Sequence, residues 1–217
     1  MPATPASPAR DCPLCPRLLA YRTSLRAAEP GWHNAPVPSF GDSSGRLLVV
    51  GLAPGVRGAN RTGRPFTGDF AGTLLYETLI AFGFATGKFA ADPADGLTPV
   101  DCRIVNAVRC VPPQNKPEPA EIRACNDFLR AEIAAMPRLR VILALGLIAH
   151  QAVLRAHGMK LAAARFAHGA QHRLADGVLL ADSYHVSRYN TNTGRLTEPM
   201  FAAVVGAIRA EIAGSAD

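Results

Sequence analysis

The sequence predicts an α/β fold, and two observations support that prediction. Short runs of aliphatic residues, typical of strands buried on both faces, alternate with segments that have helical periodicity. The first run, 46–50, leads into a loop rich in glycine and proline before any helix begins. Because ligands of open α/β sheets bind beyond the carboxyl ends of the strands, we expect the functional site at this loop.

The length and the charge of the chain limit the number of domains and the kind of partner that we expect. A chain of 217 residues suits one α/β domain, 1–217, with a sizeable core. Residues 1–10 lack the apolar stretch of a signal peptide and are expected to form a flexible tail. No apolar run is long enough to cross a bilayer, so we expect a cytoplasmic protein with no membrane contact. The net charge of +6 favours a polyanionic partner, although a GC-rich genome would also enrich arginine over lysine.

The elements follow in order along the chain. Aliphatic runs predict strands at 46–50, 102–108, 140–146 and 178–183. Helical periodicity predicts helices at 17–22, 70–83, 119–135, 147–157 and 198–212. The segments between them contain many glycines and prolines, and we expect coil at 29–45, a loop at 86–100, and a small hairpin or coil at 161–177.

The loop after the first strand carries the strongest signal for a ligand. Gly51 and Gly55 lack a Cβ, so the backbone can approach a ligand closely, and Pro54 stiffens the turn. The connection continues to Asp69 before helical periodicity begins. Loops of this length inside a compact domain are usually functional.

Two polar residues stand at the ends of later strands. Asn106 is a turn residue or an amide that recognises a ligand edge through one donor and one acceptor. His185, directly after the fourth strand, is better placed for chemistry than a histidine within a helix.

The five cysteines raise the question of a metal site. An odd number in a chain without an export signal argues against a disulfide framework. Cys12 and Cys15 form a Cys-x-x-Cys pair, which by itself is a weak signal; together with Cys110 and Cys125 they could form a four-thiolate site for zinc or an iron–sulfur cluster. Cys102 lies within a strand and is expected to be an inert core thiol.

Four motifs together resemble the uracil-DNA glycosylase superfamily, and most closely its family 5 (type b) iron–sulfur enzymes. The motifs are Gly51-Leu52-Ala53-Pro54-Gly55, 58–69, 106–110 and His185-Val186-Ser187 with 190–197. The resemblance covers nearly the whole chain. Leu52 stands where the related family 4 enzymes carry Glu, and family 5 resembles this chain in lacking a polar residue there. Two departures are Val186, where many relatives have Pro, and Arg57, where much of family 5 has His.

The resemblance implies a three-layer α/β/α fold with a central four-stranded parallel sheet. It also implies a [4Fe-4S] cluster on Cys12, Cys15, Cys110 and Cys125, and a mostly monomeric protein. The implied reaction is hydrolysis of the N-glycosidic bond to uracil, hypoxanthine or another deaminated base in DNA, the first step of base excision repair. Such enzymes flip the target base out of the duplex.

Roles for site residues follow from this resemblance. Phe66 would stack on the flipped base, although it would otherwise be a core aromatic. Asn106 would bond the base edge, and His185 would donate to the carbonyl oxygen next to the breaking bond. Asp69 would position water or stabilise the oxocarbenium-like sugar, and it also suits a helix N-cap. The backbone of Gly51, Leu52, Ala53, Pro54 and Gly55 would shape the pocket.

The loop after His185 resembles a wedge that enters the minor groove. The residues expected to contact DNA are Arg61, Arg64, Ser187, Arg188, Tyr189, Asn190 and Arg195, some of which would otherwise be solvated surface charges. Three alternatives remain: a strict family 4-like uracil enzyme, a non-catalytic module that binds damaged DNA, and an iron–sulfur electron carrier. Leu52 argues against the first, and His185 with Asp69 against the second. The long base-binding loops and the basic charge argue against the third.

Overall fold

A six-stranded sheet forms the centre of the molecule in the computed structural model, which describes residues 7–214. The strand order is β1-β5-β2-β6-β8-β7. The four middle strands are parallel to one another: β5 (Cys102–Asn106), β2 (Leu47–Gly51), β6 (Val141–Leu145) and β8 (Leu179–Ser183). The four parallel strands that the sequence predicts are thereby confirmed.

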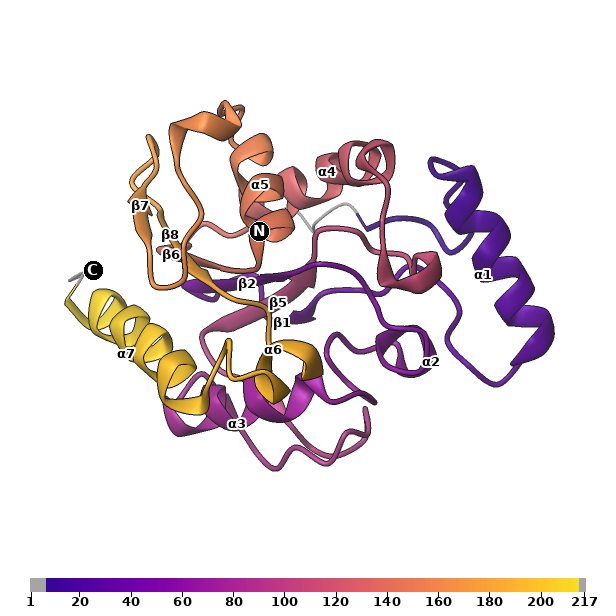
Figure 1. The fold of residues 1–217 in the computed structure, drawn as a ribbon, viewed down its shortest axis with the longest axis horizontal. Coiled ribbons are helices and arrows are strands. Elements are labelled where there is room, and N and C mark those ends of the chain that lie inside the picture. The colour runs from indigo at the N-terminus through magenta and orange to yellow at the C-terminus, as the bar shows by residue number, and fades with distance from the viewer. Residues whose placement is uncertain (1–6, 215–217) are drawn as a thin grey trace.

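Helices cover both faces of the sheet and create three layers (Figure 1). On one face lie α4 (Pro119–Ala134) and α5 (Leu147–Ala156), and on the other lie α3 (Ala71–Ala81) and α7 (Glu198–Gly214). Helix α1 (Pro16–Ala28) is longer than the predicted 17–22 and lies at one end of the molecule (Figure 1). No helix in residues 7–214 is long and apolar enough to span a membrane.

The buried strands explain why aliphatic runs marked them in the sequence. Every residue of β2, β6 and β8 is buried, because helices shield both faces. Alternate side chains of β2 enter different cores: Leu47 and Val49 pack on the α3 and α7 side, while Leu48 and Val50 pack on the α4 and α5 side. A strand buried on both faces therefore reads as a continuous apolar run.

Short elements extend this framework where the sequence predicted coil or loop. Strands β1 (Phe40–Gly41) and β7 (Gln171–Arg173) pair antiparallel with β5 and β8 at the two sheet edges. A separate ribbon joins β3 (Ala85–Thr86) to β4 (Thr98–Pro99). Helices α2 (Ala59–Thr62) and α6 (Arg188–Asn192) and the 3-10 turns η1 (Pro113–Asn115) and η2 (Leu161–Ala163) also lie in predicted loops or coil. Of the expected tail 1–10, residues 1–6 lie outside the described residues.

Candidate active site

The carboxyl ends of the parallel strands meet at a cleft of about 750 Å³. Gly51 at the end of β2 stands opposite Asn106 at the end of β5, and His185 follows β8. The cleft is lined by Leu52, Ala53, Gly55, Arg57, Gly68, Asp69, Phe70, Ala71, Asn115, His185, Ser187 and Arg188. A smaller recess beside it brings together Phe66, Asp69, Asn106 and His185, with Ala53, Pro54 and Gly55. Four side chains that the sequence singled out for base binding and catalysis thus line one recess.

The glycine at the end of β2 leaves room for the floor of this recess. A Cβ on Gly51 would lie 2.5 Å from Asn106 Oδ1 and 2.5 Å from the Phe66 ring, closer than nonbonded atoms approach. Phe66 itself has a φ of 52°, which is unusual for a residue with a side chain. Its ring is buried and lies 6.1 Å from the His185 ring, centroid to centroid. The ring and the amide are therefore held close together in the recess.

Asp69 is fixed against two other glycines of the same loop. A Cβ on Gly58 would lie 2.1 Å from Asp69 Oδ2, and one on Gly55 would lie 2.8 Å from it. Its Oδ1 accepts a hydrogen bond of 3.2 Å from the backbone N–H of Ala71, the first residue of α3. The residue is exposed to the cleft, yet the protein atoms around its carboxyl group partly remove it from water, and this desolvation raises its pKa. Asp69 thus hydrogen-bonds the first residue of α3 while it also faces the cleft, but the N-cap position itself is held by Phe70.

His185 is a neutral imidazole in this environment. Burial lowers its pKa to about 4, because a charged ring loses its hydration there. No residue among 7–214 hydrogen-bonds its ring nitrogens, so an N–H remains available to a ligand. Its backbone carbonyl accepts a 2.8 Å hydrogen bond from the Asn190 side-chain amide, which fixes His185 to α6. The arrangement provides an uncharged hydrogen-bond donor in the recess.

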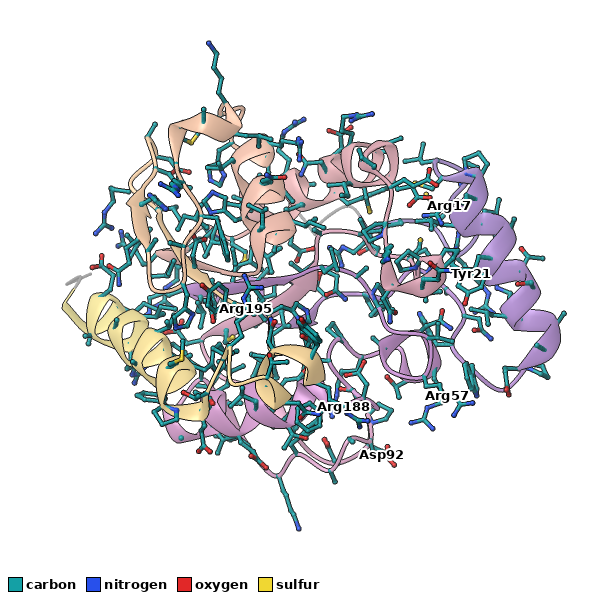
Figure 2. All side chains as sticks on the ribbon, viewed as in Figure 1. Arg17, Tyr21, Arg57, Asp92, Arg188 and Arg195 are labelled. Carbon is teal, nitrogen blue, oxygen red and sulfur yellow. The ribbon has the colours of Figure 1, made fainter. Side chains whose placement is uncertain are left out.

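Helix α6 forms one wall of the cleft. Ser187 caps it by accepting a 3.4 Å hydrogen bond from the backbone N–H of Asn190. Arg188 lines the cleft with its guanidinium 5.3 Å from the Phe70 ring centre, and Tyr189 is 72% exposed. Figure 2 shows Arg57 and Arg188 on the side of the molecule where α2 and α6 lie. A cation and an exposed aromatic thus stand beside the cleft.

Arg195 and Arg61 lie elsewhere on this surface. The Arg195 guanidinium lies 4.6 Å from the Tyr184 ring centre and keeps its side chain exposed. Arg61 is exposed on α2. Neither residue lines the cleft, so any contact they make with a ligand lies outside it.

The prediction that Arg64 contacts DNA is wrong. Its side chain is 6% exposed and forms an ion pair with Asp95, whose side chain is 2% exposed, through two 2.8 Å hydrogen bonds. The guanidinium also lies within 6 Å of the ring centres of Phe40, Tyr76 and Phe89. Arg64 therefore joins the motif loop to the 86–100 loop inside the protein. Sequence reasoning missed this because its partner lies 31 residues away.

Five cleft residues were not predicted as site residues: Arg57, Gly68, Phe70, Ala71 and Asn115. Asn115 comes from η1, where proline-rich sequence offered no signal beyond the polarity of its side chain; its φ is 56°. Arg57 and Gly68 come from the loop after β2, and Phe70 and Ala71 come from the start of α3. Arg57 departs from the histidine that the family resemblance leads us to expect, yet it lines the cleft.

The four cysteines of the predicted metal site converge on a second, apolar cavity. Cys12 and Cys15 come from the segment before α1, Cys110 from the loop after β5, and Cys125 from α4. None of the four is in a disulfide. Cys102 lies buried in β5 outside this cavity, as predicted for a core thiol.

The chemistry of these four thiols fits a metal or an iron–sulfur cluster. Burial, reinforced by the other cysteines, raises the pKa of Cys15 to about 11, and burial raises that of Cys110 to about 12. Several of these thiols can therefore be ionised together only if a cation in the cavity balances their negative charge. The backbone N–H of Arg109 donates to Cys125 Sγ at 3.3 Å, a polar contact suited to a ligating sulfur.

Fold and site together define a three-layer α/β protein with a ligand cleft at the carboxyl ends of its parallel strands and a four-thiol cavity to one side. Residues 38–209 match the family model of the uracil DNA glycosylase superfamily. A type-5 uracil-DNA glycosylase of Thermus thermophilus is 48% identical over 200 residues, which cover 89% of this chain and 90% of that protein.

Two relatives from one organism belong to different branches of that superfamily, and this chain is more similar to the type-5 relative. A type-5 uracil-DNA glycosylase of Pyrobaculum aerophilum is 40% identical and covers 90% of this chain and 86% of its own. A type-4 uracil-DNA glycosylase of the same organism is 33% identical, and the match covers 70% of this chain and 63% of that protein. The chain belongs to the uracil DNA glycosylase superfamily, in its type-5 branch.

Proposed function

We propose that this protein hydrolyses the N-glycosidic bond of uracil in DNA, as the names of its type-5 relatives state for them. The observation that carries the proposal is the recess, where an aromatic ring, an amide, a neutral imidazole and a carboxylate converge. An aromatic ring stacks on a flat base, and an amide pairs with a base edge through one donor and one acceptor. The two remaining groups supply chemistry.

In the proposed reaction, the bond between the sugar C1′ and the base nitrogen breaks, and its electron pair leaves with the base. His185 donates its N–H to the carbonyl oxygen on which negative charge develops, and no proton needs to be transferred. Asp69, as the carboxylate, stabilises the positive charge on the sugar or orients the water that adds to C1′. That water then loses a proton to solvent.

The cleft beside the recess supports two finer proposals. Leu52 leaves the wall nonpolar, and a nonpolar wall does not discriminate between bases by hydrogen bonding, so hypoxanthine is also a substrate. The helix α6 side of the cleft, with Ser187, Arg188 and the exposed Tyr189, inserts into the duplex as the base leaves the stack. Asn190 positions His185 from this helix.

The four-thiol cavity holds a [4Fe-4S] cluster in this proposal, with Cys12, Cys15, Cys110 and Cys125 as ligands. Its role is structural, because it links the segment before α1 to the loop after β5, away from the recess. Protein with these cysteines replaced should lose its stable fold. If such a protein remains folded and fully active, the structural role is wrong.

The experiment uses purified, cluster-loaded protein and duplexes with one uracil, one hypoxanthine or no damaged base. Alkali then cleaves any abasic site. The variants His185→Ala and Asp69→Ala should lower single-turnover rates by about 100-fold or more. Matched controls are His157→Ala, at the C-cap of α5, and Asp127→Ala, in an exposed pair with Arg130.

Each outcome decides one part of the proposal. Cleavage of uracil alone would overturn the hypoxanthine assignment and leave the glycosylase intact. Uracil cleavage that both variants keep would overturn the assigned roles. No cleavage by folded, cluster-bearing protein would overturn the enzymatic function and favour a module that binds damaged DNA.

A further inference from the structure

Three metal-ligating side chains meet on the opposite side of β8 from the cores of α3 and α7. His150 comes from α5, His172 from β7 and Asp182 from β8. Each offers one ligand atom, and these atoms all lie within 4.8 Å of one another. None of the three lines the cleft or the recess. The proposed glycosylase reaction therefore gives this cluster no role.

The strand register explains why the three meet. His172 pairs with Leu180 across the antiparallel β7 and β8, so both side chains stand on the same face of the sheet. Asp182 is two residues further along β8 and shares that face. Helix α5 covers this face and places His150 between them, with its ring centroid 5.7 Å from that of His172. His150 is 1% exposed and Asp182 0%.

Both ring nitrogens of His150 face an acceptor oxygen, so a neutral imidazole cannot satisfy both contacts. Its Nε2 lies 3.1 Å from the carbonyl oxygen of Ala164, so this nitrogen must carry the proton and donate. Its Nδ1 lies 2.8 Å from Asp182 Oδ1, which is also an acceptor when ionised. A neutral imidazole has only one N–H, so a second proton or a metal cation must lie between Nδ1 and the carboxylate.

Two further atoms of the cluster have no hydrogen-bond partner among the described residues. They are Asp182 Oδ2 and His172 Nε2, which lie 3.5 Å apart and are both inaccessible to solvent. An unpaired carboxylate oxygen in a buried position is costly. The separation is too long for a strong charge-assisted hydrogen bond, and a cation that both atoms ligate would satisfy them.

We propose that His150 Nδ1, His172 Nε2 and the Asp182 carboxylate bind one divalent transition-metal ion, with zinc as the best fit. Two imidazoles and a carboxylate are ligands that zinc accepts, with a water in the fourth position. The His172 side chain is 24% exposed, so the site lies near the surface at the sheet edge, although its ligand atoms are inaccessible to solvent. The Ala164 carbonyl would fix the His150 tautomer, as partners of metal-bound histidines do. The ion would clamp the edge strand β7 to α5.

The test uses cluster-loaded protein without a histidine tag, treated with a chelator and then titrated with zinc chloride in a calorimeter. Zinc-edge X-ray absorption reports the ligand atoms, and this matters because the four cysteines also bind zinc if the cluster is lost. The proposal expects one zinc with nitrogen and oxygen neighbours at about 2.0–2.1 Å and no sulfur at about 2.3 Å.

Three variants test the residues. His172→Gln, on an edge strand and partly exposed, should fold normally and weaken zinc binding by at least about 100-fold, since loss of an outer-shell partner alone costs 10- to 100-fold. Asp182→Asn should do the same. The control His157→Gln removes a histidine that faces a single carboxylate, Asp176, at 3.3 Å, and it should bind zinc like the unmodified protein.

A second readout is stability. Zinc should raise the melting temperature of the unmodified protein and of His157→Gln, and leave that of His172→Gln unchanged. Absence of zinc binding by the unmodified protein, sulfur neighbours at the zinc, or undiminished binding by His172→Gln would each overturn the proposal. In those cases the cluster is a carboxylate shared by two histidines through protons alone.

Discussion

Asp69 and His185 are both shifted toward their neutral forms by their surroundings. Protein atoms around Asp69 raise its pKa, and burial lowers that of His185 to about 4. Within residues 7–214, no opposite charge offsets the loss of hydration at either side chain. For His185 this keeps the imidazole uncharged at neutral pH, so that it stabilises developing charge as a hydrogen-bond donor. For Asp69 it means that a nearby positive charge, such as an oxocarbenium-like sugar, has a strong effect.

The pH dependence of the reaction should reveal this pair. As pH falls from 8 to about 6, single-turnover rates on uracil duplexes should show no inflection from His185, because its imidazole remains neutral throughout. Further acidification should lower the rate, because the raised pKa lets Asp69 take up a proton at higher pH than an ordinary aspartate and because His185 becomes charged near pH 4. An inflection near pH 6.5 that disappears in His185→Asn would show instead that this histidine titrates normally.

Gly58 tests how closely Asp69 must be held. A Cβ there would lie 2.1 Å from Asp69 Oδ2 and 2.7 Å from its Cγ, so Gly58→Ala must displace the carboxylate. We expect single-turnover rates to fall by about 100-fold, the cost of a misplacement near 1 Å. Gly31→Ala is the matched control, since its added Cβ meets no atom within 4 Å. Equal rates for the two variants would mean that the position of Asp69 does not limit the reaction.

At the scale of elements, the sequence predicts those helices and strands that a local pattern of residues marks, and it misses the short elements that carry no such pattern. The four parallel strands are recognisable in the sequence as largely apolar runs, because each residue of β2, β6 and β8 is buried between helix layers. The edge strands β1 and β7 are two and three residues long and partly exposed, so no alternation or apolar run marks them. Helices α2 and α6 are single short turns within motif loops, where glycine and polar residues suggest coil.

Site residues are likewise predictable where a local pattern marks them, and not where their position depends on distant segments. The recess residues Phe66, Asp69, Asn106 and His185 follow strand ends or the loop after β2, so the rule for open α/β sheets and the family resemblance pointed to them. Arg64 belongs to the same motif, yet its side chain is buried against a carboxylate 31 residues away. Asn115 reaches the cleft only through the fold of a proline-rich loop. Contacts between distant segments were the part that the sequence did not supply.

The Arg64–Asp95 ion pair should therefore matter for stability. Asp95→Asn would leave the guanidinium of Arg64 buried without its charge partner, and we expect a loss of about 3–5 kcal/mol in the free energy of unfolding. Urea titration at pH 7 measures this loss. The control is Asp92→Asn, three residues earlier, whose side chain lies exposed at the surface (Figure 2).

The same pair has an effect in acid. Arg64 lowers the pKa of Asp95 below its usual value of 3.8, so the contribution of the carboxylate is complete above that value and is lost as pH falls further. The unmodified protein should consequently lose stability below about pH 4, and Asp95→Asn should lose less over that interval. Equal unfolding free energies for Asp95→Asn and Asp92→Asn at pH 7 would contradict the structural role of Arg64.

At the scale of the whole molecule, the cleft, the thiol cavity and the histidine–aspartate cluster occupy separate places around one sheet. The cleft collects the carboxyl ends of the parallel strands, while the cluster of His150, His172 and Asp182 lies under α5 at the β7 edge. The thiol cavity lies between α1 and α4. A rigid sheet at the centre lets each site be assembled from segments far apart in the chain.

The net charge of +6 makes DNA binding a property of the whole molecule that individual arginines tune. On undamaged duplex DNA, the logarithm of the binding constant should fall linearly with the logarithm of salt concentration, because bound counterions are released. Arg57→Ala and Arg188→Ala, at the cleft, should each reduce the slope by about 1. Arg173→Ala removes an exposed charge next to the start of β8, at the end of the parallel strands opposite the cleft, and should leave the slope unchanged. Equal effects of all three substitutions would show that the duplex is attracted by total charge rather than held over the cleft.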